Sequence, residues 1–187
     1  LNRSHPVTNV KDFGSRCDIW YHNMSQHPQQ GGPILKENLD GIKFISTHFP
    51  KHLSYFHNDI KKCENILQDS TTNFHFWSDL EQYITFQLLL QTRLNVGAGA
   101  ILDLLNYDIK SLHISGITFF EGGYNSSHPT RDSDFISSIQ SQKIPNHPDK
   151  DKVLNHAQKP QKQLLQLIVE NHNIITLDEE VKTALYL

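Results

Sequence analysis

Two closely spaced glycines, Gly97 and Gly99, are the residues of this sequence best suited to binding an anion. They stand in the stretch LNVGAGAILDLLNY, residues 94–107, at the start of an apolar run. A glycine turn at a helix start presents backbone amides and the positive end of the helix dipole, which together attract a phosphate. The stretch is therefore a candidate phosphate site, although the same glycines would also permit a sharp turn between two packed helices.

The glycine pattern excludes two common nucleotide motifs. A dinucleotide fingerprint places G-x-G-x-x-G between a strand and a helix, but here Leu102 occupies the third position and the preceding segment has a helical pattern. A P-loop is excluded because no Gly-Lys-Ser/Thr sequence follows. What remains is a helix-start turn suited to a nucleotide monophosphate.

Twelve histidines raise the question of a metal site. None belongs to a pattern with a second ligand pair at zinc spacing. His48 and His52 are four residues apart, but Pro50 interrupts the helix that would bring them together. We therefore predict no metal site. Cys17 and Cys63 could form one disulfide or remain thiols.

Alternating strand and helix patterns would position the glycine turn. Strands are expected at residues 18–23, 42–49, 73–77, 111–120 and 174–177, and helices at 51–68, 78–91, 98–106, 161–172 and 178–187. Ser78 and Glu81 have the capping-box spacing, and Pro160 suits the first turn of the fourth helix. This order predicts an α/β fold with a mostly parallel sheet and helices on both faces, whose ligands bind beyond the carboxyl ends of the strands.

Composition narrows the possible partners. The chain of 187 residues is 37% apolar, enough for one domain over residues 1–187. Its formal net charge of −3 and scattered basic residues argue against nucleic acid. We expect no membrane span and find no leader pattern in this segment. Asn23 and Asn125 fit the N-glycosylation pattern, which matters only in a secretory lumen.

Three segments resemble the sialylmotifs of the eukaryotic-type sialyltransferases, glycosyltransferase family 29. Residues 94–125, from LNVGAG to EGGYN, are similar to the small sialylmotif. Residues 1–23 resemble the end of the large sialylmotif, and residues 155–180 resemble the very small motif. The resemblance implies one Rossmann-like domain, a variant of the glycosyltransferase A type, whose N-terminal strand and first half of the large motif would lie upstream of Leu1.

The resemblance also implies specific site residues. His156 would be the general base of the reaction. The nucleotide-binding residues would be Asn2, Asn95, Val96, Gly97, Ala98, Gly99 and Tyr124. Gly97 matches the family's Ser/Thr-Thr-Gly turn, while Asn95 and Val96 replace its first two residues. Asn2 would touch the phosphate, and Tyr124 would offer a hydroxyl.

Some positions depart from the family pattern. Gly123 stands where the third motif has a histidine, for which His128 is a possible substitute. Gln161 stands where the very small motif has a glutamate, and Cys17 replaces the usual threonine. The disulfide that joins the large and small motifs in animal members has no counterpart. These departures keep open a second hypothesis, a non-catalytic nucleotide-sugar-binding or interaction protein of the same fold.

The chemistry implied by the resemblance is inverting transfer of a sugar, foremost sialic acid from CMP-sialic acid, to a glycan hydroxyl. It requires a base for the acceptor hydroxyl, and a histidine with an ordinary pKa of about 6.5 suits that task. Amides aimed at the leaving phosphate would make a metal or other cofactor unnecessary. Typical members work in the Golgi or secretory lumen with an upstream anchor; otherwise the chain would be cytoplasmic. An unrelated doubly wound α/β enzyme remains another alternative.

Three residues of the first predicted strand have their own interpretation. Asp18 and Trp20 are expected to be structural, with Trp20 in the core. His22, at the end of the strand, could face the acceptor.

Overall fold

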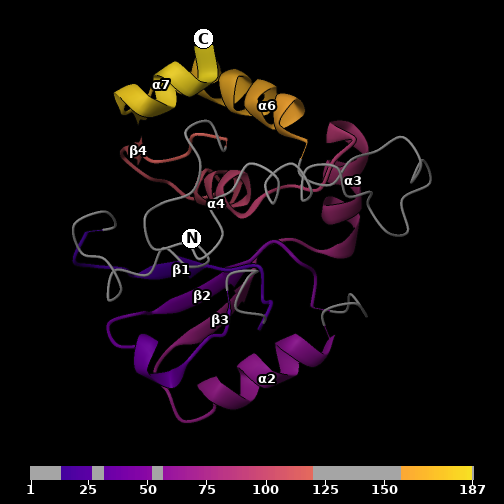
Figure 1. Ribbon diagram of the computed structural model, residues 1–187, viewed down its shortest axis with the longest axis vertical. Helices are drawn as coiled ribbons and strands as arrows, with labels where there is room; N and C mark the ends of the chain where they lie inside the picture. The colour runs from indigo at the N-terminus through magenta and orange to yellow at the C-terminus, as the bar shows by residue number, and fades with distance from the viewer. Residues whose placement is uncertain (1–13, 27–31, 52–56, 120–156, 187) are drawn as a thin grey trace, which may run out of the picture. The chain divides into compact units, whose positions relative to one another are not determined.

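A computed structural model describes residues 14–26, 32–51, 57–119 and 157–186. They form two compact units that divide between Thr85 and Phe86 (Figure 1). Every strand pair among the described residues is parallel, which confirms the predicted α/β class and the parallel pairing. None of the described helices is both long and apolar enough to cross a membrane. The single domain predicted from the sequence stays a prediction.

The first unit contains a three-stranded parallel sheet in the order β1-β2-β3. Its elements are β1 (Ile19–Tyr21), the 3-10 helix η2 (Lys36–Asn38), β2 (Phe44–Thr47), α2 (His57–Leu67) and β3 (Asn73–Phe76). Trp20 and Ile45 are register partners and are both buried, so they form the centre of the core. Helix α2 lies along one side of this sheet in Figure 1 and adds Ile60, Cys63 and Leu67, which share one helix face.

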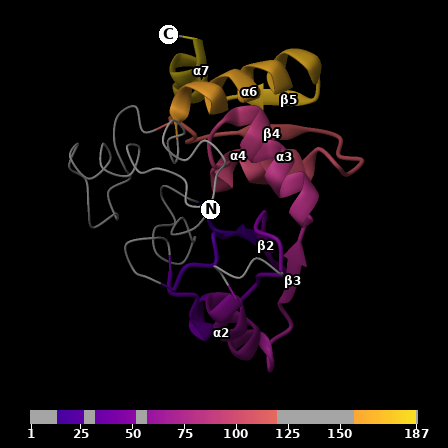
Figure 2. The same cartoon turned by 90° about the vertical axis from the view of Figure 1, so that its right-hand side faces the viewer.

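The second unit contains a two-stranded parallel sheet with helices around it. Its elements are α4 (Val96–Leu104), β4 (Leu112–Ile114), α6 (Gln158–Asn171), β5 (Ile175–Leu177) and α7 (Glu179–Tyr186). In Figures 1 and 2, α6 and α7 lie together on one side of the strands and α4 lies on the other. Ile101, Ile114, Leu165, Ile175 and Val181 join one buried cluster, so each of the five elements contributes to the core.

Helix α3 (Leu80–Leu90) begins with a capping box that is one residue later than predicted. Asp79 Oδ1 accepts from the Gln82 amide at 2.8 Å, and Gln82 Oε1 accepts from the Asp79 amide at 3.3 Å. Ser78 does not cap the helix, because its hydroxyl is buried and donates to the His48 carbonyl oxygen. The predicted Ser78–Glu81 box is therefore wrong, since Ser78 has a partner outside the helix.

Helix α4, unlike α3, begins earlier than predicted. Its first residue is Val96 and its N-cap is Asn95, so Gly97, which was expected before the helix, lies inside the first turn with Gly99 close after it. Pro160 is the third residue of α6, which confirms its place in the first turn. The strands predicted at 42–49 and 111–120 shorten to β2 and β4, because an apolar run continues into loops that pack on the core.

Candidate functional site

Asn95 organises the start of α4. Its backbone is extended, with φ −78° and ψ 162°, and its side-chain Oδ1 accepts a hydrogen bond from the Ala98 amide at 2.7 Å. Its own carbonyl oxygen accepts from the Gly99 amide at 2.9 Å, the first bond of the helical ladder. This is the N-cap geometry that asparagine favours. Asn95 thus has a structural role of its own as the helix cap.

Gln161 of α6 ties the same turn to a second helix. Its Oε1 accepts from the Asn95 amide at 2.8 Å, and its Nε2 donates to the Ala157 carbonyl oxygen at 3.2 Å. The side chain is fully buried. A buried amide with both ends bonded is a stable arrangement, because neither polar group loses its hydrogen bond on leaving water.

Thr92 provides a second connection between the two segments. Its buried Oγ1 accepts from the Ala157 amide at 2.9 Å. Ala157 directly follows His156 in the sequence, and Thr92 precedes Asn95 by three residues. The structure therefore joins the residue before α6 to the segment that leads into α4.

The four amides at the start of α4 can be accounted for one by one. A helix leaves its first four amides without intrahelical partners. Asn95 donates to Gln161 and Ala98 donates to Asn95. Within the described residues, the remaining two amides, those of Val96 and Gly97, have no protein partner, and both residues are only half-buried. Among the described residues, the turn therefore leaves two backbone donors without an acceptor at the positive end of a helix dipole.

The predicted site residues are only partly brought together by the described structure. Asn95, Val96 and Gly97 are half-buried, whereas Ala98 and Gly99 are buried and their amides already donate to Asn95. The roles of these residues as nucleotide contacts stay predictions. Asn2, Tyr124 and His156, together with the possible substitute His128, lie outside the described residues.

A second group of buried polar side chains follows the strands of the first unit. His22 follows β1 and is fully buried; its Nδ1 accepts from the Met24 amide at 3.0 Å. Its ring also packs edge-on against Trp20, with centroids 5.1 Å apart. His48 follows β2, is buried, and stacks its ring near Phe49. Burial of His22 leaves no surface for an acceptor in this structure. Sequence reasoning considered His48 only as a metal ligand and Ser78 only as a helix cap, and it did not place either in a buried polar group, because the carboxyl end of β2 at Thr47 was not located.

The other residues singled out in the first strand behave as expected. Trp20 is 2% exposed and lies in the core, which confirms its prediction. The Asp18 carboxylate accepts from Arg16 at 2.8 Å and pairs with Lys43 at 3.0 Å. The hydrogen bond from Arg16, followed by that from Lys43, lowers the pKa of Asp18. Asp18 is therefore a surface ion-pair residue at the start of β1.

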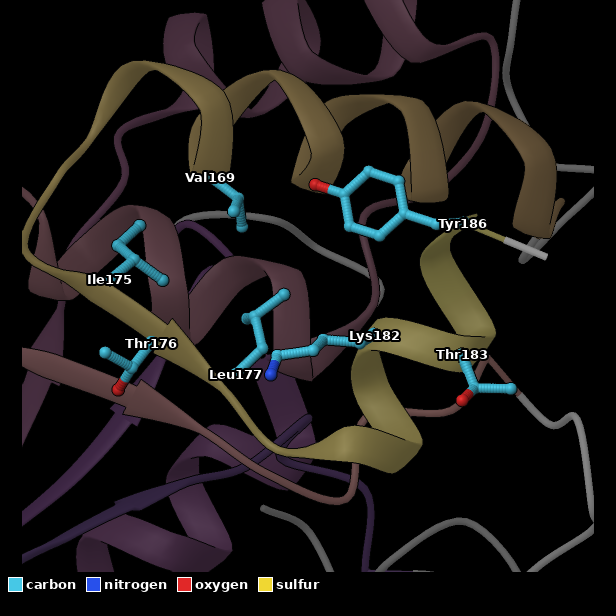
Figure 3. Close-up of a pocket in the computed structure, with 7 residues that line it drawn as sticks. All are labelled: Val169, Ile175, Thr176, Leu177, Lys182, Thr183 and Tyr186. Atoms are coloured by element: carbon cyan, nitrogen blue, oxygen red, sulfur yellow. The ribbon is translucent and has the colours of Figure 1, made fainter.

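A cavity of about 600 Å³ lies between α6, β5 and α7 (Figure 3). Val169, Ile175 and Leu177 form an apolar floor, and Lys182 and Tyr186 extend from α7 beside it. The Lys182 ammonium is already paired with Glu179 Oε1 at 2.6 Å. None of the predicted site residues that the structure describes lines this cavity, so it is separate from the α4 turn.

The two cysteines are not paired with each other. Cys17 is half-buried and Cys63 is buried, and both are free thiols. Burial raises the pKa of the Cys63 thiol from 9.0 to about 12, with Asp59 and Glu64 adding to the effect. Gln26 Nε2 donates to Cys63 Sγ at 3.0 Å. Among the described residues, no three histidine, cysteine or acidic side chains gather closely enough to hold a metal ion.

Comparison of the chain with models of protein families, with curated proteins and with solved structures gives no match.

Proposed function

We propose that this chain is a metal-independent glycosyltransferase of the sialyltransferase type, with a Rossmann-like fold related to the glycosyltransferase A type. It would transfer sialic acid from CMP-sialic acid to a glycan hydroxyl with inversion. One observation carries the proposal: the start of α4 holds two of its four leading amides in side-chain bonds and presents the other two. Such a helix start binds a phosphate through its amides and dipole.

The proposed mechanism assigns a separate task to each segment. The Val96 and Gly97 amides would receive the phosphate of the leaving CMP, whose negative charge grows as the glycosidic bond breaks. His156 would take the proton of the acceptor hydroxyl, because a hydroxyl is a weak nucleophile near neutral pH. The bond between the Ala157 amide and Thr92 supports this pairing of segments.

A second candidate function is nucleotide-sugar binding without catalysis. Gln161 favours it, because it occupies the position of an acidic residue in the resemblance and has both ends of its amide bonded within the fold. A neutral amide in that state can neither accept nor release a proton. The two candidates share the nucleotide site and differ only in turnover.

Thermal unfolding with CMP, UMP, GDP and NAD tests the shared nucleotide site. A ligand that binds only the folded chain raises the melting temperature by mass action. We expect CMP to raise it by several degrees and the other three to have smaller effects. The absence of any shift with CMP would contradict both candidates.

Hydrolysis of CMP-sialic acid separates the two candidates. We expect slow release of CMP from the wild-type chain, and a fall of about 100-fold or more in His156→Ala, because a positioned base contributes roughly 10²–10⁴-fold. The CMP-induced thermal shift should persist in this variant. His113→Ala, which removes an exposed histidine of β4, is the matched control and should hydrolyse the donor normally. CMP binding without turnover on a broad acceptor panel would favour the non-catalytic candidate.

A further inference from the structure

Gln161 makes two different kinds of hydrogen bond from one buried side chain. Its oxygen accepts from the Asn95 amide at 2.8 Å, and its nitrogen donates to the Ala157 carbonyl oxygen at 3.2 Å. The two partners are 66 and 4 residues away in sequence, so the side chain links the α4 turn to the start of α6. The side chain is 0% exposed, so water cannot replace either bond.

Only a primary amide satisfies both partners at every pH. A carboxylate could accept from Asn95, but it cannot donate to Ala157 and would place its charge against a carbonyl oxygen. An apolar side chain of similar size would leave both backbone groups without a bond in a buried place. Both partners of Gln161 are backbone groups, so among the described residues no ionisable side chain takes part in these bonds.

The bond to Asn95 determines where the α4 turn stands. Asn95 holds the Ala98 amide through its own side chain. The two amides between them, those of Val96 and Gly97, are the ones proposed to bind the ligand. Fixing the Asn95 backbone therefore fixes the direction of the Val96 and Gly97 donors. Preorganised donors bind an anion more tightly because they lose less freedom on binding.

We propose that Gln161 is a positioning residue that aims the Val96 and Gly97 amides at the nucleotide phosphate, with a neutral side chain that leaves no negative charge beside that phosphate. The inference rests on the proposed function for the identity of the ligand. Its structural half, the fixing of the turn, does not depend on the ligand.

Hydrogen exchange of the 187-residue chain tests whether Gln161 fixes the turn. In Gln161→Leu, the Asn95 amide loses its acceptor and should exchange at least about tenfold faster, together with the Ala98 amide that the Asn95 side chain holds. Gln166→Leu is the matched control: Gln166 lies on the same helix and donates to the Leu185 carbonyl oxygen at 2.6 Å. It should leave exchange at Asn95 and Ala98 unchanged. Unchanged exchange in Gln161→Leu would overturn the proposal.

CMP titration tests the nucleotide half. Gln161→Leu should weaken CMP binding about tenfold while Gln166→Leu stays within about twofold of wild type. In Gln161→Glu, burial should raise the pKa of the introduced carboxyl, so the charged form prevails at pH 8 and the protonated form at pH 5.5. The protonated form can donate to Ala157 as the amide does. We expect about tenfold weaker binding than wild type at pH 8 and near-equal binding at pH 5.5.

At each pH, the CMP affinity of the variant is divided by that of the wild type. The CMP phosphate itself titrates near pH 6, and the effect of its titration on affinity cancels in this ratio. A Gln161→Glu ratio that does not change with pH would overturn the nucleotide half. If the wild-type chain binds no CMP, the proposed function fails and the nucleotide role of Gln161 fails with it. The exchange result then still decides whether Gln161 holds the turn.

Discussion

The buried polar side chains at the ends of β1 and β2 differ in their partners from those that hold the α4 turn. In the first unit, His22 accepts from Met24 and Thr47 accepts from Phe49, each two residues ahead, although the buried hydroxyls of Thr72 and Ser78 donate to carbonyl oxygens 30 residues away. At the α4 turn the bonds are long-range: Gln161 bonds to Asn95 and Thr92 bonds to Ala157, over 66 and 65 residues. Local bonds shape the loop that leaves a strand, whereas long-range bonds fix two elements against each other.

This difference separates two groups that look alike in sequence. Ligands in parallel α/β folds bind beyond the carboxyl ends of strands, so His22 and His48 are the conventional candidates. Their burial shows that in this structure they serve the loops and the core. The α4 turn is the better candidate, because its bonds leave the amides of two half-buried residues, Val96 and Gly97, without a partner among the described residues. The donors and acceptors that remain unpaired say more about a binding site than the position of a residue after a strand.

The largest effect on stability is expected from His22→Ala. The substitution removes a fully buried ring and leaves the Met24 amide without its acceptor, at a residue with a φ of 63°. Such a core truncation with an unsatisfied amide should cost about 3 to 5 kcal/mol in the free energy of unfolding. Both tryptophans lie in the first unit, so urea unfolding followed by tryptophan fluorescence measures it.

The control for His22→Ala is the CMP titration. If the polar group of the first unit serves only folding, the folded variant should bind CMP as the wild type does. A variant that stays folded but loses CMP affinity would break the comparison between the units. His113→Ala removes an exposed histidine and should cost less than about 0.5 kcal/mol.

Asp178→Ala is expected to have the next largest effect. One carboxylate oxygen of Asp178 accepts from the Val181 amide at 2.7 Å and caps α7, while the other accepts from the Gly116 amide at 3.1 Å, 62 residues away. Loss of a cap and of a long-range bond should cost about 2 kcal/mol. Circular dichroism during urea unfolding checks this value, with exposed Glu179→Ala as the control. A cost equal to that of the control would show that long-range bonds matter less than we infer.

The buried thiol of Cys63 makes the free energy of unfolding of the first unit depend on pH. Because burial raises the pKa of the folded thiol from 9.0 to about 12, its contribution is complete below pH 9 and is lost as pH rises towards 12. The free energy of unfolding should fall by about 1 kcal/mol by pH 9.5 from this group alone. Cys63→Ala should lack this fall in a pH series of urea unfolding curves, whereas Cys17→Ala should retain it. If the free energy of unfolding of Cys63→Ala fell by the same amount, the fall would come from other titrating groups.

Asn95→Ala should have the smallest effect on stability and a large effect on the site. An N-cap asparagine contributes about 1 kcal/mol or less in a partly exposed position. Its loss frees the turn that offers the Val96 and Gly97 amides, so CMP affinity should fall about tenfold. Calorimetric titration of CMP measures this change, and Asn95→Asp tests the charge, since aspartate caps equally well but repels a phosphate. Normal CMP affinity in Asn95→Asp would argue against an anion at this turn.

The elements of the fold could largely be predicted from the sequence, because periodicity and turn residues act locally. The five described strands and α2, α3, α4, α6 and α7 all lie within or overlap the expected ranges. Helix starts were less certain. Ser78 and Asp79 are both good caps, and only the position of the His48 carbonyl decides that Ser78 is used elsewhere. Asn95 was named as a nucleotide-binding residue, but not as the cap that moves the helix start to Val96.

The site could be predicted only in part. Gly97 and Asn95 were located from the glycine pattern and the resemblance, both of which are visible within one segment. Gln161 was visible only as a departure from a pattern, because its role depends on a residue 66 positions away. No local signal identifies such a partner. The same holds for Thr92, whose bond to Ala157 spans a similar distance.

The Asn95 cap has a further consequence for the number of phosphate groups that the turn could bind. A helix start with all four amides available could spread its donors over two linked phosphates. Asn95 removes one of the four and Gln161 removes another, so the remaining pair matches two oxygens of a single phosphate. A diphosphate would have to find the partners of its second phosphate elsewhere. In the proposed nucleotide site, one asparagine and one glutamine would thus favour a monophosphate through the number of donors that they leave.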